Sequence, residues 1–304
     1  MRSFNKFILI ILSTLLISAL LLAGCGRKAG TLRIMSFGYA ETDITAEMVK
    51  ALVESETEFK VEIIYNVASV MIASEATSKG ESDMYLTYTG TQLSTVMGQE
   101  LTEEWMDPVK VRDYVEKRAK EEYGMTLLGN LGFDNTYAVT VKRSFAEANN
   151  LRTISDLSAH ASDLTIASDY DFLNREGVVS FTRLVETYGL DFKSAVGMDY
   201  GLMYRAIDTG DVDAMVAYSS DGRIASMNLF ILEDEKNVFP PYDAAFIIRT
   251  ETLENMPGLE EVLNKLTGRI DMETIHVLNA FVDLDEMDPK EVALNFLREE
   301  GLLN

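Results

Sequence analysis

Strand-like and helix-like segments alternate along the first third of the chain, and this alternation constrains the fold more than any other feature. Residues 32–35, 61–64 and 83–86 read as strands, and the segments between them, 44–53 and 70–79, carry apolar residues at helical spacing. A β-α-β-α-β order is typical of a parallel sheet with helices on its faces. The sequence therefore predicts the α/β fold class.

A second alternating unit follows, and two segments marked by glycine or proline separate it from the rest. The segments lie near 131–136 and 236–241, where the chain is expected to leave one lobe and later rejoin it. We therefore predict two α/β lobes joined by a two-strand hinge, with a ligand enclosed between them. The first lobe is expected to comprise 31–133 and 239–304, and the second 134–238.

The predicted secondary structure of the later chain consists of short strands and helices. The expected strands are 126–128, 137–141, 164–167, 213–217 and 229–232, and the expected helices are 108–123, 178–188 and 202–207. After residue 242 the pattern returns to helices. The last helix has Asp288 as N-cap, Pro289 at its first position and Gly301 just after its end.

The N-terminus is typical of an export signal. Arg2 and Lys6 precede an apolar run over 7–23, which ends in small residues directly before Cys25, the only cysteine. This ending resembles the lipobox of bacterial lipoproteins. It predicts a signal peptide over 1–24 and a lipid-anchored tether over 25–30, which would hold the protein on the extracytoplasmic face of the cell membrane by its lipid alone. The alternative is an uncleaved signal anchor with an ordinary buried cysteine.

The chain is strongly acidic, with a net charge of −22 that becomes −24 when Arg2 and Lys6 are removed with the signal. This charge argues against binding to nucleic acid or to anionic lipid surfaces. It favours cationic ligands by long-range attraction, which salt screens within roughly 10 Å. Solubility alone also explains such a charge.

Residues typical of catalysis are scarce. Only two histidines, His160 and His276, are present, and neither has metal-ligand spacing around it. The acidic run 283–288 lacks the central glycine of a calcium loop, so it is expected to be a solvated loop with a helix cap. We therefore expect a binding protein without a catalytic residue, metal or cofactor.

Four tyrosines stand at strand ends or at the expected crossings. Tyr88 and Tyr218 follow predicted strands, whereas Tyr137 and Tyr242 lie at the two crossings. In a two-lobe fold these positions converge on the cleft, although each tyrosine taken singly also fits core or hinge packing. Tyr85 is expected in the core.

The motifs around these tyrosines resemble those of one family. They are Tyr88-Thr89-Gly90-Thr91, Asn135-Thr136-Tyr137-Ala138, Tyr218-Ser219-Ser220-Asp221-Gly222 and Pro240-Pro241-Tyr242. In order and spacing they resemble the glycine betaine, carnitine and choline binding proteins of osmoprotectant ABC importers, over essentially the whole mature chain. The resemblance implies a type II periplasmic binding protein fold. It also implies that the protein's partners are a membrane permease and its ATPase.

The resemblance also implies that Tyr88, Tyr137, Tyr218 and Tyr242 form an aromatic cage for a quaternary ammonium group. Such a group has no N–H to donate, and its diffuse charge suits the negative faces of aromatic rings. Each ring contributes about 0.5–2 kcal/mol.

The resemblance implies fewer residues for the part of the ligand beyond the ammonium group. In the family a threonine and an arginine hold a carboxylate, which implies Thr91 and Arg175 here, and Asn135 is a further polar contact. Phe37 stands where the family has a lysine, and Thr42 replaces a polar amide. Choline, carnitine and other betaines therefore remain open. The alternatives are an amino-acid or other cationic-solute receptor, or a ligand-sensing domain of the same fold.

Overall fold

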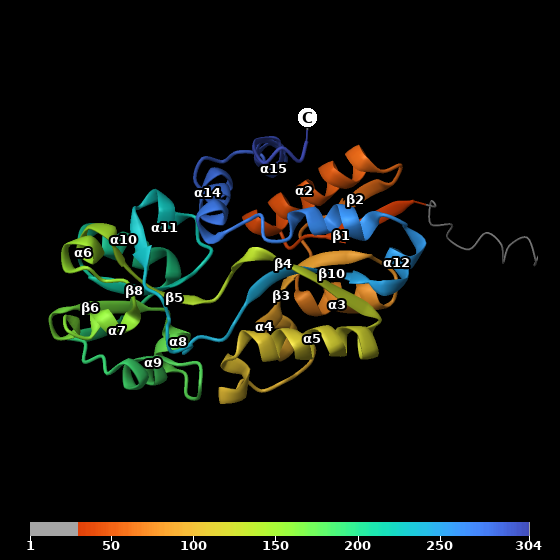
Figure 1. Ribbon diagram of the computed structural model, residues 1–304. Helices are drawn as coiled ribbons and strands as arrows, with labels where there is room; N and C mark the ends of the chain where they lie inside the picture. The colour runs from red at the N-terminus through yellow and green to blue at the C-terminus, as the bar shows by residue number, and fades with distance from the viewer. Residues whose placement is uncertain (1–29, 304) are drawn as a thin grey trace, which may run out of the picture. The chain divides into compact units, whose positions relative to one another are not determined.

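The computed structural model describes residues 30–303 of the chain (Figure 1), of which Leu32 onward forms one compact unit. The predicted signal peptide and Cys25 lie outside the described residues. Two five-stranded sheets organise the unit, with strand orders β2-β1-β3-β10-β4 and β7-β6-β8-β5-β9. The prediction of a two-lobe type II periplasmic binding fold is confirmed, with one lobe on each sheet.

The first lobe contains both early and late elements of the chain. Its strands are β1 (Thr31–Met35), β2 (Lys60–Ile64), β3 (Met84–Tyr88), β4 (Met125–Asp134) and β10 (Asp243–Arg249). Its helices and helical turns are α2 (Ala40–Glu56), α3 (Val70–Ser78), α4 (Thr89–Thr91), η1 (Gln92–Val96), η2 (Glu103–Met106), α5 (Pro108–Tyr123), α12 (Thr250–Asn255), α13 (Leu259–Leu263), η4 (Asn264–Leu266), α14 (Met272–Asp283) and α15 (Pro289–Glu299).

The second lobe lies between these two parts in sequence. Its strands are β5 (Tyr137–Lys142), β6 (Thr165–Ser168), β7 (Ser194–Gly197), β8 (Ala214–Tyr218) and β9 (Leu229–Ile231). Its helices are α6 (Arg143–Asn149), α7 (Ile154–Leu157), η3 (Ala161–Asp163), α8 (Tyr170–Asn174), α9 (Phe181–Tyr188), α10 (Tyr200–Thr209) and α11 (Arg223–Ser226).

Strand β10 was not predicted, because helices were expected after residue 242. It lies in the middle of the first sheet and pairs antiparallel with both β3 and β4. Its residues 244–248 are all buried, so they lack the alternation that marks a half-exposed strand. The sheet is therefore mixed, with β1 and β3 parallel and β10 antiparallel.

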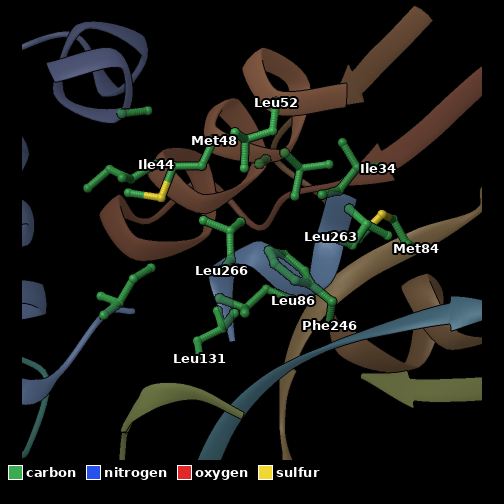
Figure 2. Close-up of a cluster of buried hydrophobic side chains, with 14 of the residues drawn as sticks. Ile34, Ile44, Met48, Leu52, Met84, Leu86, Leu131, Phe246, Leu263 and Leu266 are labelled. Carbon is green, nitrogen blue, oxygen red and sulfur yellow. The ribbon is translucent and has the colours of Figure 1, made fainter. Parts of the chain in front are cut away.

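The core of the first lobe explains the length of helix α2. Ile44, Met48 and Leu52 recur along one face and pack on Ile34 and Phe246 of the sheet (Figure 2). The helix begins at Ala40, four residues earlier than predicted, and Ala40 also belongs to this core. The earlier start places Glu41, which is 3% exposed, in the first turn.

The two crossings are bonded to each other beside the sheets. The backbone N–H of Asn135 donates to the carbonyl oxygen of Tyr242 at 3.1 Å. The hydroxyl of Thr136 donates to the carbonyl oxygen of Pro240 at 2.7 Å. Residues next to each crossing are thereby held at fixed relative positions.

Two further segments connect the lobes. Helix α14 packs Ile275 and Leu278 into the first lobe's core, and its Asn279 donates to the carbonyl oxygen of Ser220 in the second lobe at 2.9 Å. The segment before α5 places Met106 in the second lobe's core. Within residues 30–303, no helix is both long and apolar enough to cross a membrane.

Candidate ligand site

Two of the predicted cage tyrosines face each other across a strand pair. Tyr137 begins β5 and Tyr218 ends β8, and the antiparallel register sets them directly opposite. Their rings stack with centroids 5.3 Å apart and an interplanar angle of 27°. Tyr137 also packs on Phe172 at 4.7 Å and on Phe239 at 5.9 Å, so the pair rests on a layer of buried rings.

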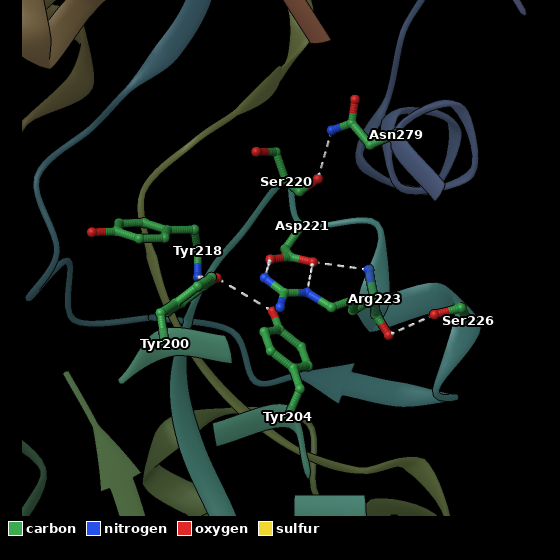
Figure 3. A network of polar contacts seen from close by, with 8 residues as sticks. All are labelled: Tyr200, Tyr204, Tyr218, Ser220, Asp221, Arg223, Ser226 and Asn279. Atoms are coloured by element: carbon green, nitrogen blue, oxygen red, sulfur yellow. Dashed lines mark hydrogen bonds and ion pairs between the residues drawn. The ribbon is translucent and has the colours of Figure 1, made fainter. Parts of the chain in front are cut away.

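A polar network contacts Tyr218 and includes Tyr200, Tyr204, Asp221 and Arg223 (Figure 3). The Tyr218 backbone N–H donates to the Tyr200 hydroxyl at 2.9 Å, and the two rings lie 5.1 Å apart. The Arg223 guanidinium carbon lies 3.9 Å from the ring centroid of Tyr204. Arg223 also donates to Asp221 through Nε at 2.9 Å and Nη2 at 2.6 Å, and this pairing lets a charged side chain support the tyrosines. Tyr204 is buried and belongs to this network.

Tyr242 lies on the first lobe, beside the turn that follows β3. A Cβ added to Gly90 would lie 2.8 Å from Cε2 of Tyr242 and 2.6 Å from the carbonyl oxygen of Pro241. Glycine is therefore needed there for the ring to pack against the backbone. Thr91 is the next residue and is half-buried. Thr91 therefore follows directly on the residue against which the Tyr242 ring packs.

Arg175 is exposed and pairs with Asp171, and its charge acts on three of the cage tyrosines. Burial raises the pKa of Tyr137, Tyr218 and Tyr242, and the positive charge of Arg175 opposes that rise in each case. A cation close to the rings is available to contact an anionic part of a ligand.

Tyr88 differs from the other three, because it is 7% exposed and its ring belongs to the first lobe's core. Its hydroxyl donates to Glu41. The same carboxylate accepts from Asn135 Nδ2 at 2.7 Å and from Asn279 Nδ2 at 3.2 Å. Burial raises the pKa of Glu41, and hydrogen bonds from these residues oppose the rise. Glu41 therefore joins α2, β3, the first crossing and α14.

Phe37 and Thr42, the two departures from the family pattern, are both packed against neighbours. The Phe37 ring stacks on Tyr39 at 6.1 Å and meets the edge of Tyr85 at 6.2 Å. Thr42 is buried, and its hydroxyl bonds Ser36 Oγ and the carbonyl oxygen of Tyr39, each at 2.9 Å. Tyr85 is fully buried, as predicted, and burial raises its pKa to about 12.

A cavity of 260 Å³ lies beside this cluster and holds residues that sequence reasoning did not assign to the site. It is lined by Tyr39, Ala40, Glu41, Asn135, Tyr218, Ser220, Asp221, Asn279 and Asp283. Glu41 resembles an ordinary acid of a first helical turn, so its role had no separate signal in the sequence. Within residues 30–303, no three His, Cys, Asp or Glu side chains are arranged to hold a metal ion.

The acidic run at 283–288 is only partly the solvated loop that was expected. Asp283 is the last residue of α14 and lines the cavity. Asp288 is the predicted N-cap of α15 and accepts from the Lys290 N–H at 2.8 Å.

Two α/β lobes with aromatic residues at the strand crossings define this chain as a two-lobe periplasmic solute-binding protein. Residues 30–299 match the family described as the substrate binding domain of ABC-type glycine betaine transport systems. The chain belongs to this family.

Named relatives agree with this assignment. The carnitine transport binding protein OpuCC of Listeria monocytogenes is 35% identical over 98% of this chain and 97% of its own length. A glycine-betaine-binding protein of Pseudomonas aeruginosa is 29% identical over 91% of this chain and 90% of its own length. The crystal structure of a glycine betaine/carnitine/choline ABC transporter protein aligns with a TM-score of 0.84 and 31% identity, covering 90% of this chain and all of the other.

Proposed function

We propose that this protein captures a quaternary ammonium solute, such as glycine betaine, choline or carnitine, in a tyrosine cage and delivers it to an ABC importer. The observation that carries the proposal is the stacked pair of Tyr137 and Tyr218. The electrostatic coupling of Tyr242 to Tyr218 and to Arg175 supports it. The names of the relatives support the same class of solute. The role is binding, without catalysis, and the partners are a permease and its ATPase.

The proposed site draws on both lobes. Tyr88 and Tyr242 belong to the first lobe, whereas Tyr137 and Tyr218 belong to the second. Thr91, Asn135 and Arg175 supply polar contacts to the rest of the solute. A solute held from both sides favours the closed arrangement of the lobes. The proposal keeps the lobe boundaries expected from the sequence, 31–133 with 239–304 for the first lobe and 134–238 for the second.

The proposal includes a lipid anchor on Cys25, which places the protein on the extracytoplasmic face of the cell membrane. The supporting pattern is the small-residue run before the only cysteine. The variant Cys25→Ala should release the protein from the membrane fraction of cells that express it. Retention of the variant in that fraction would instead support an uncleaved anchor.

Calorimetric titration of the full chain in detergent with choline, glycine betaine and carnitine tests the proposed solute class. We expect at least one of them to bind with a micromolar Kd, about −8 kcal/mol. Binding of none of them below millimolar concentration would contradict the proposal.

The variant Tyr137→Leu tests the cage itself. Leucine keeps the apolar contact with Phe172 but removes the ring face, so affinity should fall at least tenfold, about 1.4 kcal/mol. Tyr114→Leu is the matched control, because Tyr114 packs on Trp105 in the first lobe, away from the cage. Equal affinity of the two variants would remove Tyr137 from the site.

A further inference from the structure

The cavity beside the tyrosines is dominated by hydrogen-bond acceptors. Its lining includes three carboxylates, from Glu41, Asp221 and Asp283, and no lysine, arginine or histidine. Asp221 is already paired with Arg223. Glu41 accepts from neutral donors, namely the hydroxyls of Tyr88 and Ser220 and two amides, and its lining neighbours among residues 30–303 include no cation that would compensate its charge when it is ionised.

Asn279 adds an acceptor whose orientation is fixed. Its Nδ2 donates to the Ser220 carbonyl oxygen at 2.9 Å and to Glu41 Oε2 at 3.2 Å. A carbonyl oxygen cannot donate, so the amide is oriented with its nitrogen toward Ser220. Oδ1 therefore points away from Ser220 (Figure 3), and it is buried with no hydrogen-bond partner among residues 30–303. Asn279 lines the cavity, and since an unpaired buried acceptor is costly, a hydrogen-bond donor that reaches this atom is favoured.

We propose that this cavity is a subsite for an O–H or N–H group of a solute that carries a net positive charge. The inference rests on the proposed function, since Tyr218 contributes to both the cage and the cavity. With the ammonium head against the rings, the remainder of the solute reaches Asn279 and the nearby carboxylates. A solute carboxylate in the same place would meet like charges.

Arg175 is a cation whose charge acts on the tyrosines of the cage. Its Nη2 already pairs with Asp171, and it is exposed. A solute carboxylate would have to compete with Asp171 and with water for this guanidinium, and exposed ion pairs contribute only about 0–1 kcal/mol. The acceptor-lined cavity therefore outweighs Arg175 in setting the class of solute, and it favours a hydroxylated or aminated monocation over a zwitterion.

Three probes with the same trimethylammonium head test the subsite on the full chain in detergent. Choline carries a hydroxyl, ethyltrimethylammonium has no donor, and glycine betaine carries a carboxylate. We expect choline to bind at least tenfold more tightly than either of the others in calorimetric titrations. Equal binding of choline and ethyltrimethylammonium would show that the cavity holds only water, and equal or tighter binding of glycine betaine would also overturn the subsite. Both results would leave the proposed function intact, whereas binding of none of the probes would refute both.

Two variants that each remove one negative charge test whether the preference for choline arises in the cavity. Asp283→Asn removes a carboxylate at the exposed end of the cavity, so it should narrow the choline to glycine betaine affinity ratio at least threefold. Asp285→Asn makes the same change in net charge two residues further on, outside the lining, and should leave the ratio unchanged. An equal change in both variants would indicate long-range charge and would overturn the subsite.

Discussion

At the residue scale, Glu41 holds several neighbours together. Its carboxylate accepts hydrogen bonds from Tyr88, Asn135 and Asn279, which come from three different elements. The residue is 3% exposed, so water cannot replace these bonds without entering the fold. Each buried donor left without an acceptor costs about 1–3 kcal/mol.

We therefore expect Glu41→Ala to lower the free energy of unfolding by about 3 kcal/mol. Urea unfolding of the two proteins measures this change. Glu47→Ala is the matched control, because Glu47 lies on the same helix and also accepts from a tyrosine, Tyr65, but at an exposed site. The control should change stability by less than about 0.5 kcal/mol. A similar effect of both variants would contradict the role given to Glu41.

The buried position of His276 makes the stability of the protein depend on pH. Its Nε2 bonds the carbonyl oxygen of Ser219, and burial lowers its pKa below the ordinary value of 6.5. The unfolded chain therefore binds a proton at His276 more readily than the folded chain. The contribution of His276 to the free energy of unfolding is complete above pH 6.5, and it is lost as pH falls through the lowered pKa.

The variant His276→Gln keeps a donor but does not titrate. Between pH 7.5 and 5.5 its Tm should fall less than that of the native protein, and the comparison cancels the contributions of the carboxyl groups. Parallel Tm curves for the two proteins would show that His276 does not carry this dependence.

At the element scale, the turn that follows β3 sets the position of Tyr242. In α4, a Cβ on Gly90 would lie within 2.9 Å of two ring atoms of Tyr242 and 2.6 Å from a backbone oxygen. We expect Gly90→Ala to displace that ring, to lower solute affinity roughly tenfold and to cost about 1–3 kcal/mol of stability. Calorimetric titration and urea unfolding measure the two effects.

Gly201 provides the comparison for Gly90. It lies in α10, where an added Cβ would meet nothing within 4 Å. Gly201→Ala should therefore keep the native affinity and raise stability by up to about 1 kcal/mol. If Gly90→Ala also kept the native affinity and stability, the close approach of Gly90 to Tyr242 would not be needed for solute binding.

The elements differ in how well the sequence predicts them. Helix α5 could be predicted, because Asp107 caps it, Pro108 begins it and Gly124 ends it in the left-handed conformation. Strand β10 could not, since it is buried on both faces and follows two prolines. The alternating pattern, by contrast, predicted both lobes and the residues at the crossings.

The site was also predictable only in part. Tyr137 and Tyr218 lie at strand ends, where position along the chain fixes position in the sheet. Glu41 and Asn279 are 238 positions apart in the sequence, and the packing of α14 on α2 brings them into contact. Such a contact depends on the assembled core, and no local pattern in the sequence encodes it.

At the scale of the whole molecule, the contact of α11 with α14 links the lobes through the backbone. A Cβ added to Gly222 would lie 2.5 Å from the backbone nitrogen of Ala280 and 2.9 Å from its Cα. Neither atom can move without shifting α14. The arrangement of the lobes therefore depends on a residue without a side chain at this point.

We expect Gly222→Val to separate the second lobe from α14 and to increase the radius of gyration, measured by small-angle X-ray scattering. Solute affinity should fall at least tenfold. Ser226→Val, on the exposed part of the same short helix, should change neither quantity. An unchanged radius of gyration in Gly222→Val would contradict this account.

The placement of Met106 bears on whether the lobes can exist apart. This residue precedes α5 in the chain, yet its side chain completes the core of the second lobe, and Glu103 beside it pairs with Arg183 of α9. A fragment cut at the strand crossings would lack both residues and would leave apolar surface open to water. The second lobe is therefore not an autonomous folding unit, and the protein should unfold in one cooperative step.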